Sequence, residues 1–204
     1  MPPAGADRKE RRKTEIERYL EHVKTGVKER MDEGWLFYHG ESTMEEISVM
    51  TEASMTAVTL PHDWSIGFPF DEHADTLGAG GYVKAGTGWY KKRFSVDAGT
   101  EDEDVILRFD GIYMNSKVWL NGQLLGGHVY GYTPFSFSVK ERLAPERENE
   151  LIVFVDNSAQ PNSRWYSGSG ITRPVWIYRE NKVHISRESV FLRTEDEEFE
   201  NITS

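Results

Sequence analysis

Hydrophobic positions follow a helical period only near the start of the chain. From about Asp7 to Met31, apolar side chains recur at steps of three and four residues within a charged segment, which predicts one amphipathic helix that Asp7 could cap. The apolar stripe is narrow, so we interpret this leader as a terminal helix that lies on the domain or is partly frayed, with a partner-binding helix as the alternative. The stripe consists of Ile16, Tyr19, Leu20, Val23, Val27 and Met31.

After Gly34 the pattern changes to short apolar runs separated by Gly, Pro, Asn and Asp, which is typical of antiparallel β structure. Short strands with turns between them predict an all-β sandwich or barrel without a further long helix. The expected strands are residues 35–38, 57–60, 89–96, 105–109, 117–120, 135–139, 151–155, 175–178 and 182–185.

Alternation within these runs predicts which side chains face the core. In 105–109 the apolar residues alternate with Arg108, and 135–139 alternates between apolar residues and serine, so one face of each strand should be buried. The expected core positions are Val105, Leu107, Phe109, Phe135, Phe137 and Val139. Between two apolar runs, Asn121-Gly122 predicts a hairpin over 119–125, because this pair tolerates the positive φ angles of a type I′ turn.

Residues 61–88 lack periodicity and are rich in Gly, Pro and acidic side chains, so we expect a long loop of the kind that is functional or mobile. Its Gly78–Gly81 segment is not a phosphate-binding loop, since no Lys-Ser/Thr pair follows it. We divide the chain into a helical leader (1–33), a β domain (34–187) and a linker or the start of a truncated second domain (188–204).

Composition excludes several classes of function. The net charge of −10, from 34 acidic and 24 basic residues, disfavours a nucleic-acid-binding surface and favours a neutral partner or a protein. Cysteine is absent, which removes disulfides, thiol nucleophiles and thiolate zinc sites. No apolar run is long enough for a signal peptide or a membrane span, so we expect no membrane partner and favour a cytoplasmic location.

The histidines give no indication of a metal or another cofactor. They have no short ligand spacing, which argues against a zinc site made by the protein alone, while calcium or magnesium on loop carboxylates stays open. The six positions are His22, His39, His62, His73, His128 and His184.

The strongest candidate for ligand binding is Arg164-Trp165-Tyr166 in the stretch 162–176. Aromatic rings stack on the apolar faces of sugars, and a planar guanidinium reads hydroxyls or a carboxylate. Trp165 and Tyr166 could instead pack under the loop. We interpret Gly168 and Gly170 as backbone devices that allow positive φ or close approach, and Arg173 as half of a structural ion pair. Asn115 is a further candidate for substrate contact, beside Tyr113, His128 and Tyr130, for which packing or turn roles are the commoner explanation.

Catalysis by the acids of the long loop is not expected. A glycosidase pair needs one carboxyl kept protonated by an apolar pocket and one kept ionised on a rigid frame, and a loop this polar offers neither. In His62-Asp63-Trp64, no nucleophile accompanies the histidine, so we interpret Asp63 as holding a turn that Trp64 anchors. The loop acids considered are Asp63, Asp71, Glu72 and Asp75.

Six motifs together resemble the N-terminal sugar-binding domain of glycoside hydrolase family 2, which includes β-galactosidases, β-glucuronidases and β-mannosidases. The resemblance covers about residues 34–187 and excludes the leader. The motifs are Leu60-Pro61-His62-Asp63-Trp64, Gly88-Trp89-Tyr90-Lys91-Lys92, Phe109-Asp110-Gly111-Ile112-Tyr113-Met114-Asn115-Ser116, Trp119-Leu120-Asn121-Gly122, Gly131-Tyr132-Thr133-Pro134-Phe135 and Ser163-Arg164-Trp165-Tyr166-Ser167-Gly168-Ser169-Gly170-Ile171.

This resemblance implies a galactose-binding-like jelly-roll β-sandwich, followed in the family by an immunoglobulin-like domain and a catalytic (β/α)₈ barrel. Both catalytic carboxyls, about 5 Å apart in retaining enzymes, belong to that barrel. We therefore expect a non-catalytic, active-site-completing domain of a β-galactosidase-like exo-glycosidase, with carbohydrate and the missing domains as partners, while a homo-oligomer stays open. A free-standing carbohydrate-binding module and a purely structural domain are the alternatives.

The chain departs from the familiar β-galactosidases at two places near the sugar. The resemblance implies an Asn-Pro-Thr-Gly turn at the first place, but this chain has Ala85-Gly86-Thr87-Gly88. At the second place, in the later loop, it implies an acidic residue, but this chain has Arg164. Thr172 also stands where an aromatic residue is usual. The first two departures leave open whether galactose is the sugar that is bound.

Overall fold

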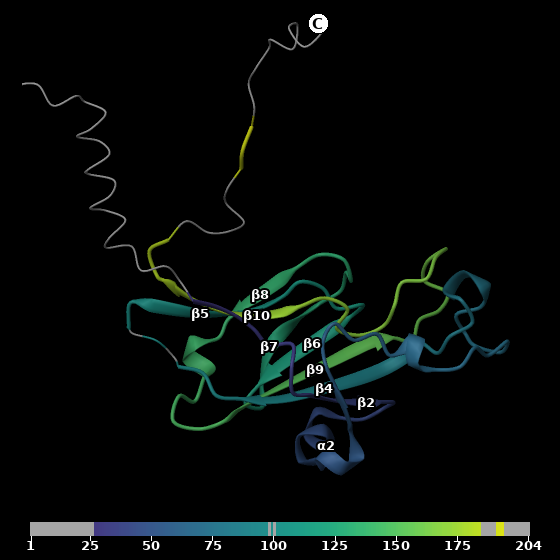
Figure 1. The fold of residues 1–204 in the computed structure, drawn as a ribbon, viewed down its shortest axis with the longest axis horizontal. Helices are drawn as coiled ribbons and strands as arrows, with labels where there is room; N and C mark the ends of the chain where they lie inside the picture. Colours follow the sequence, from purple (N-terminus) through teal and green to yellow (C-terminus); the bar gives the residue numbers. More distant parts are fainter. Residues whose placement is uncertain (1–26, 98, 100, 185–190, 194–204) are drawn as a thin grey trace, which may run out of the picture.

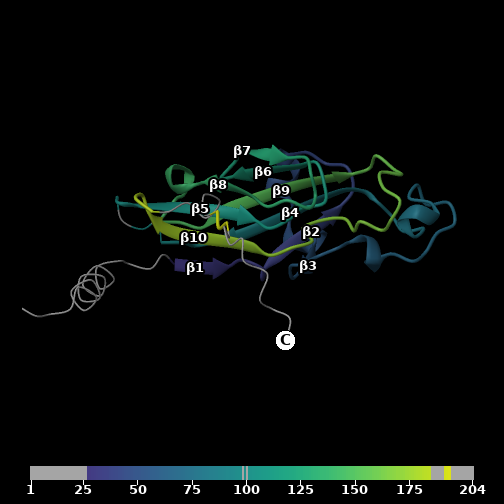
Figure 2. The ribbon, with the colours of Figure 1, turned by 90° about the horizontal axis from the view of Figure 1, so that it is seen from above.

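The computed structural model describes residues 27–97, 99, 101–184 and 191–193, and these form two antiparallel β-sheets packed face to face (Figures 1 and 2). The smaller sheet has the order β1 (Val27–Arg30), β10 (Val175–Asn181), β5 (Glu103–Phe109) and β8 (Phe135–Ser138). The larger has the order β3 (Thr56–Val58), β2 (Trp35–His39), β4 (Gly86–Phe94), β9 (Asn149–Asn157), β6 (Ser116–Leu120) and β7 (Gln123–His128). Apart from the pairs β2–β3 and β6–β7, neighbouring strands are not consecutive in sequence, and the predicted jelly-roll sandwich is confirmed.

The core lies between the two sheets and follows the predicted alternation. Val105, Leu107 and Phe109 are buried, as expected for one face of β5. On β8, Phe135 and Phe137 are only half-buried, although Phe135 stacks on Phe109 with ring centroids 5.2 Å apart. This difference arises because β8 is an edge strand of the smaller sheet, with a neighbour on one side only.

The Asn-Gly hairpin is confirmed. Strands β6 and β7 pair with Leu120 opposite Gln123, and the two turn residues have the positive φ angles of a type I′ turn, 51° at Asn121 and 77° at Gly122.

A short helix that the hydrophobic pattern did not predict, α2 (Met44–Val49), covers part of the outer face of the larger sheet (Figure 1). It begins with a capping box, in which the Glu46 N–H donates to Thr43 Oγ1 and the Thr43 N–H donates to Glu46 Oε2. Its buried Ile47 packs with Trp89 and Ile152 of the sheet. The other helical turns among the described residues are 3₁₀ helices: η1 (Glu52–Ser54), η2 (Ser65–Gly67), η3 (Gly78–Gly80) and η4 (Lys140–Arg142).

Two expected elements are wrong where the structure describes them. Val27–Arg30 is the edge strand β1 rather than the end of the leader helix, and residues 1–26 lie outside the described residues. Pairing with β10 places Lys28 Nζ 3.8 Å from the ring centroid of Trp176, a cation–π contact that a helix would lose. Strand 182–185 is also wrong: β10 ends at Asn181, residues 182–184 form a bend, and 185 is not described. Our division into domains stays a prediction.

Among the described residues, no helix is long and apolar enough to cross a membrane.

Candidate functional site

Two long loops meet at one end of the sandwich because the strands that carry them are paired there. Gly86, the first residue of β4, lies opposite Asn157, the last residue of β9. The segment before β4 and the segment after β9 therefore leave the larger sheet at the same end, and both views show them side by side (Figures 1 and 2). These segments carry His62-Asp63-Trp64 and Arg164-Trp165-Tyr166.

The carboxylate of Asp63 fastens the two loops together. Its Oδ1 accepts hydrogen bonds from the main-chain N–H of Ser65 at 3.0 Å and of Ser169 at 2.9 Å, and its Oδ2 accepts one from the Tyr166 hydroxyl. Burial and the bond to Asp63 raise the pKa of Tyr166, so its hydroxyl stays a donor at neutral pH. The predicted role of Asp63 in holding a turn is confirmed by its bond from Ser65. The same carboxylate also binds the loop that carries Arg164-Trp165-Tyr166.

Gly170 allows the second loop to come this close. Its φ is 122°, and a Cβ at this position would lie 2.2 Å from the Tyr90 hydroxyl oxygen and 2.7 Å from the His62 carbonyl oxygen. Gly168, with φ of 76°, would likewise place a Cβ 2.9 Å from Asp63 Oδ2. The predicted backbone roles of both glycines are confirmed.

Tyr90 and His62 form a buried support beneath Gly170. Nδ1 of His62 lies 2.8 Å from the Tyr90 hydroxyl, which also accepts a long bond from the Ile171 N–H at 3.4 Å. Burial lowers the pKa of His62, against the opposing effect of the neighbouring Asp63 charge. Burial also raises the pKa of Tyr90. Both groups are therefore neutral near pH 7 and act as packing and hydrogen-bonding elements.

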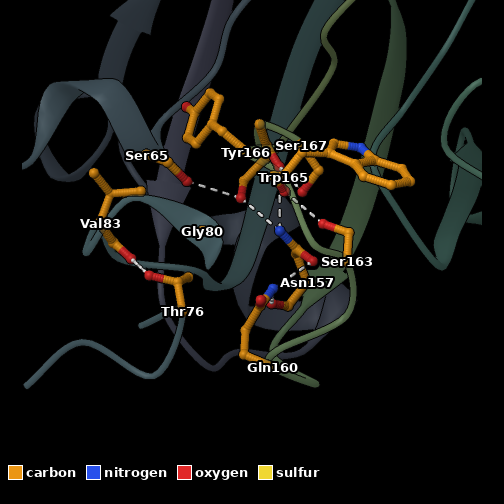
Figure 3. Close-up of a pocket in the computed structure, with 12 residues that line it drawn as sticks. Ser65, Thr76, Gly80, Val83, Asn157, Gln160, Ser163, Trp165, Tyr166 and Ser167 are labelled. Atoms are coloured by element: carbon orange, nitrogen blue, oxygen red, sulfur yellow. Dashed lines mark hydrogen bonds between the residues drawn. The ribbon is translucent and has the colours of Figure 1, made fainter. Parts of the chain in front are cut away.

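Beneath the second loop lies a small polar cavity (Figure 3). Ser169 Oγ accepts hydrogen bonds from Ser65 Oγ and Asn157 Nδ2, each 2.8 Å long, and Gln160 Nε2 donates to Asn157 Oδ1 at 2.9 Å. The free volume is about 10 Å³, room for a single water molecule and far below the size of a ligand pocket. This cavity is therefore too small for a sugar, and its hydrogen bonds support the loop from below.

That outer surface carries the three predicted residues. Trp165 and Tyr166 are 61% and 43% exposed, and Arg164 is exposed without a hydrogen bond or ion pair to any residue that the structure describes. A free guanidinium beside two exposed rings can accept a sugar on its apolar face and bind its hydroxyls or a carboxylate. That the three residues contact substrate stays a prediction.

Asn115 lies at the same end of the sandwich, but its side chain and its main-chain N–H make hydrogen bonds that stabilise the fold. Its Nδ2 donates to the Asp156 carbonyl at 3.2 Å and its N–H donates to the Val129 carbonyl. Tyr113 pairs with Gly170 through two main-chain hydrogen bonds of 2.9 Å and is buried. These contacts are those of packing and turn residues; a contact between Asn115 and substrate stays a prediction.

Arg173 does not make the predicted ion pair. Its Nη1 donates to the main-chain carbonyls of Tyr132 at 2.9 Å and Asp110 at 3.5 Å. The carboxylate of Asp110 is engaged instead by Arg108 at 3.0 Å and by the Trp176 indole at 2.7 Å. Among the described residues, the predicted ion pair of Arg173 is therefore wrong, and hydrogen bonds to main-chain carbonyls take its place.

Of the loop acids, Asp63 serves the fold, and the described residues contain no cluster that could hold a metal ion. Asp63 has its acceptor positions filled by three donors, and no group of three His, Asp or Glu side chains among the described residues could hold a metal ion. Asp71 and Asp75, with His39, His73 and Lys84, line an open depression of about 300 Å³ beside Ala85 and Gly86.

Sequence reasoning did not single out Asn157, Gln160 and Ser169, although they form the foundation of the loop. Ser169 and Asn157 carried no pattern that distinguishes a buried polar clamp from solvated loop residues, because their partners lie far away in sequence. Ser65 is 104 residues from Ser169.

Comparisons with known proteins agree with this arrangement. Residues 29–181 match the family described as "Glycosyl hydrolases family 2, sugar binding domain". The chain is 38% identical over 160 residues to the β-galactosidase BoGH2A of Bacteroides ovatus, covering 78% of this chain and 19% of that protein. It is 33% identical over 168 residues to a putative β-glucuronidase of Formosa agariphila, covering 82% of this chain and 16% of that protein.

Among solved structures, a glycosyl hydrolase family 2 member from Bacteroides cellulosilyticus superposes with a TM-score of 0.69 at 39% identity, over 76% of this chain and 20% of that chain. A β-glycosidase from Bacteroides vulgatus gives a TM-score of 0.70 at 33% identity, over the same shares of the two chains. The chain thus spans about a fifth of the length of the proteins it matches, as the sequence resemblance implied.

Proposed function

The chain belongs to the sugar-binding domain of glycosyl hydrolases family 2, and we propose that it serves as a non-catalytic wall that completes the active site of a β-galactosidase-like exo-glycosidase. In this role it positions the terminal sugar while another part of the protein supplies the two carboxyl groups. Its contribution is orientation, which can account for a large part of a rate enhancement without any bond-making group.

The observation that carries this proposal is the exposed Arg164 on a loop that is held rigidly from below. Asp63 and Ser169 fix the base of the loop through buried or half-buried hydrogen bonds, while the guanidinium has no partner in the described structure. Because the main chain of the loop is already fixed, ligand binding has to order only the arginine side chain and not the loop, which lowers the entropic cost of binding.

Two of the relatives suggest what the guanidinium could recognise. One is named a β-galactosidase and one a putative β-glucuronidase, and Arg164 can bind hydroxyls of a neutral sugar or form a bidentate pair with a sugar carboxylate. Both substrates are compatible with the proposal, and the terminal sugar has to be determined by assay.

The test is Arg164→Ala in the full-length protein. We expect kcat/KM to fall by about 10- to 100-fold, the cost of losing a charge-assisted hydrogen bond to the substrate, while the melting temperature stays unchanged. Arg164→Lys, which keeps the charge but not the planar fork, should recover only part of the loss. Unchanged kinetics in a well-folded Arg164→Ala variant would reject the proposed role.

The exposure of Trp165 and Tyr166 also fits a second function, that of a free-standing carbohydrate-binding module, which needs an open aromatic surface on this domain alone. Isothermal titration of the isolated chain with galactosides and mannans separates the two. Strong binding supports the module, whereas a site-completing wall should bind free sugar weakly or not at all. A purely structural domain would have Arg164 and Trp165 buried against another part of the protein.

A further inference from the structure

Three aromatic rings form a continuous row next to Arg164. Tyr130 and Tyr132 meet edge to face with centroids 5.7 Å apart, and the Trp165 indole Nε1 lies 3.4 Å from the Tyr132 hydroxyl. The outer two rings are exposed, 57% for Tyr130 and 61% for Trp165, and Tyr132 between them is half-buried. We call Tyr130, Tyr132 and Trp165 the aromatic ridge.

The loop that carries Tyr130 and Tyr132 is fixed to the sandwich at three points. The Asn115 N–H donates to the Val129 carbonyl at 3.2 Å, and Arg173 Nη1 donates to the Tyr132 carbonyl at 2.9 Å. Between them, Gly131 packs so tightly on Tyr113 that a Cβ there would lie 2.2 Å from the tyrosine ring. Arg173 and Asn115 are thus explained as supports of the ridge.

Tyr113 links the ridge to the Arg164 loop. Its ring lies 5.3 Å from that of Tyr132, its hydroxyl donates to Asn162 Oδ1 at 3.3 Å, and its main chain pairs with Gly170. The ridge and the Arg164 loop are therefore one connected surface on a common support.

We propose that the aromatic ridge is a subsite for the sugar ring adjoining the terminal sugar, on the leaving-group side of the scissile bond. This inference rests on the proposed function and assigns the substrate class: oligosaccharides with a sugar aglycone, rather than glycosides with small aglycones. Exposed rings with hydroxyl and indole edges suit a pyranose, whose apolar C–H face stacks while its rim of hydroxyls stays hydrogen bonded. In this arrangement Arg164 binds the terminal sugar, and Trp165, the next residue in the chain, is the first ring of the ridge, which continues to Tyr132 and Tyr130.

The experiment uses the full-length protein and two pairs of substrates that share their terminal sugar. The β-galactosyl pair is β-galactosyl fluoride and lactose, and the β-glucuronyl pair is β-glucuronyl fluoride and a disaccharide with a non-reducing β-glucuronic acid. The pair that the protein hydrolyses is used to compare Tyr130→Ala with the unchanged protein. Tyr130→Phe, which keeps the ring, and Leu124→Ala, an exposed apolar side chain at the other end of β7, are the controls.

We expect Tyr130→Ala to raise KM for the disaccharide by about three- to tenfold relative to KM for the fluoride, the loss of one stacked ring. Tyr130→Phe and Leu124→Ala should leave that ratio unchanged. An equal effect of Tyr130→Ala on both substrates, or none, overturns the subsite and favours another domain as the occupant of the ridge. The proposed function is tested separately, because Arg164→Ala must impair both substrates; a protein that hydrolyses neither pair overturns both proposals.

Discussion

The hydroxyl of Tyr166 donates a hydrogen bond to the carboxylate of Asp63, and so joins two loops 103 residues apart in the sequence. The same carboxylate accepts the main-chain N–H of Ser169, which is 1% exposed. One side chain therefore holds both the main chain of the loop at Ser169 and the hydroxyl of the Tyr166 ring. The geometry of the candidate site thus depends on a residue that need not touch a ligand.

Replacing Asp63 should break the hydrogen bonds between the two loops and lower the free energy of unfolding. Asp63→Ala leaves the buried Ser169 N–H without an acceptor and removes two further bonds, so we expect the free energy of unfolding to fall by about 3 kcal/mol. Tyr166→Phe removes one of the three bonds from a side chain that is 43% exposed and should cost about 1 kcal/mol or less. Urea denaturation of both variants measures the difference. Equal losses would show that the hydrogen bonds from the Ser65 and Ser169 N–H groups contribute nothing.

A methyl group at Gly170 should be far more harmful than one at Gly122, although both glycines have positive φ. At Gly170 the new Cβ meets the Tyr90 hydroxyl and the His62 carbonyl, whereas at Gly122 it meets nothing within 4 Å. We expect Gly122→Ala to cost about 1 kcal/mol for backbone strain alone and Gly170→Ala to cost about 3 kcal/mol or more. Thermal unfolding compares the pair, and similar melting temperatures would contradict the close packing at Gly170.

The sandwich could be predicted because alternation reports directly on burial. Val105, Leu107 and Phe109 had to face one side of a strand, whatever their partners. Elements that depend on tertiary contacts were not predictable in this way. The six residues of α2 are too few for a helix to be stable alone, and the helix is held by Ile47 against the sheet and by Lys91.

Lys91 shows why polarity can mislead a reading of the sequence. A charged side chain in a strand is expected to face solvent, but that of Lys91 is only 2% exposed. Its Nζ donates to the carbonyls of Ile47, Ser48 and Met50 at the end of α2. Burial lowers its pKa. No pattern in the sequence distinguishes such a lysine from its neighbour Lys92, because the helix end that it binds lies more than 40 residues away.

Only the part of the candidate site that is contiguous in sequence was predictable. Arg164, Trp165 and Tyr166 are adjacent in sequence, so their chemistry could be recognised together. The aromatic ridge could not, because Tyr132 and Trp165 are 33 residues apart and meet only through the fold. Arg173 was misassigned for the same reason: its partners are main-chain carbonyls, which a sequence does not display.

Stability of the domain should depend on pH through His62. Burial places its folded-state pKa below the ordinary value of about 6.5, so the unfolded chain binds a proton more readily than the folded one. Stability contributed by neutral His62 is then fully present above about pH 6.5, and it is lost as pH falls through the folded-state pKa. The neutral ring can accept the hydrogen bond of the Tyr90 hydroxyl at Nδ1, and the protonated ring cannot.

We therefore expect the free energy of unfolding to decrease between pH 7 and pH 5, and part of that decrease to vanish in His62→Gln, which cannot be protonated. The exposed His73 of the long loop provides the matched control, since His73→Gln should retain the full decrease. Urea titrations at several pH values measure the slopes, and an NMR titration of the His62 ring measures the shift directly. A slope unaltered by His62→Gln, or a His62 pKa above the ordinary value of about 6.5, would show that the charge of Asp63 outweighs burial at this site.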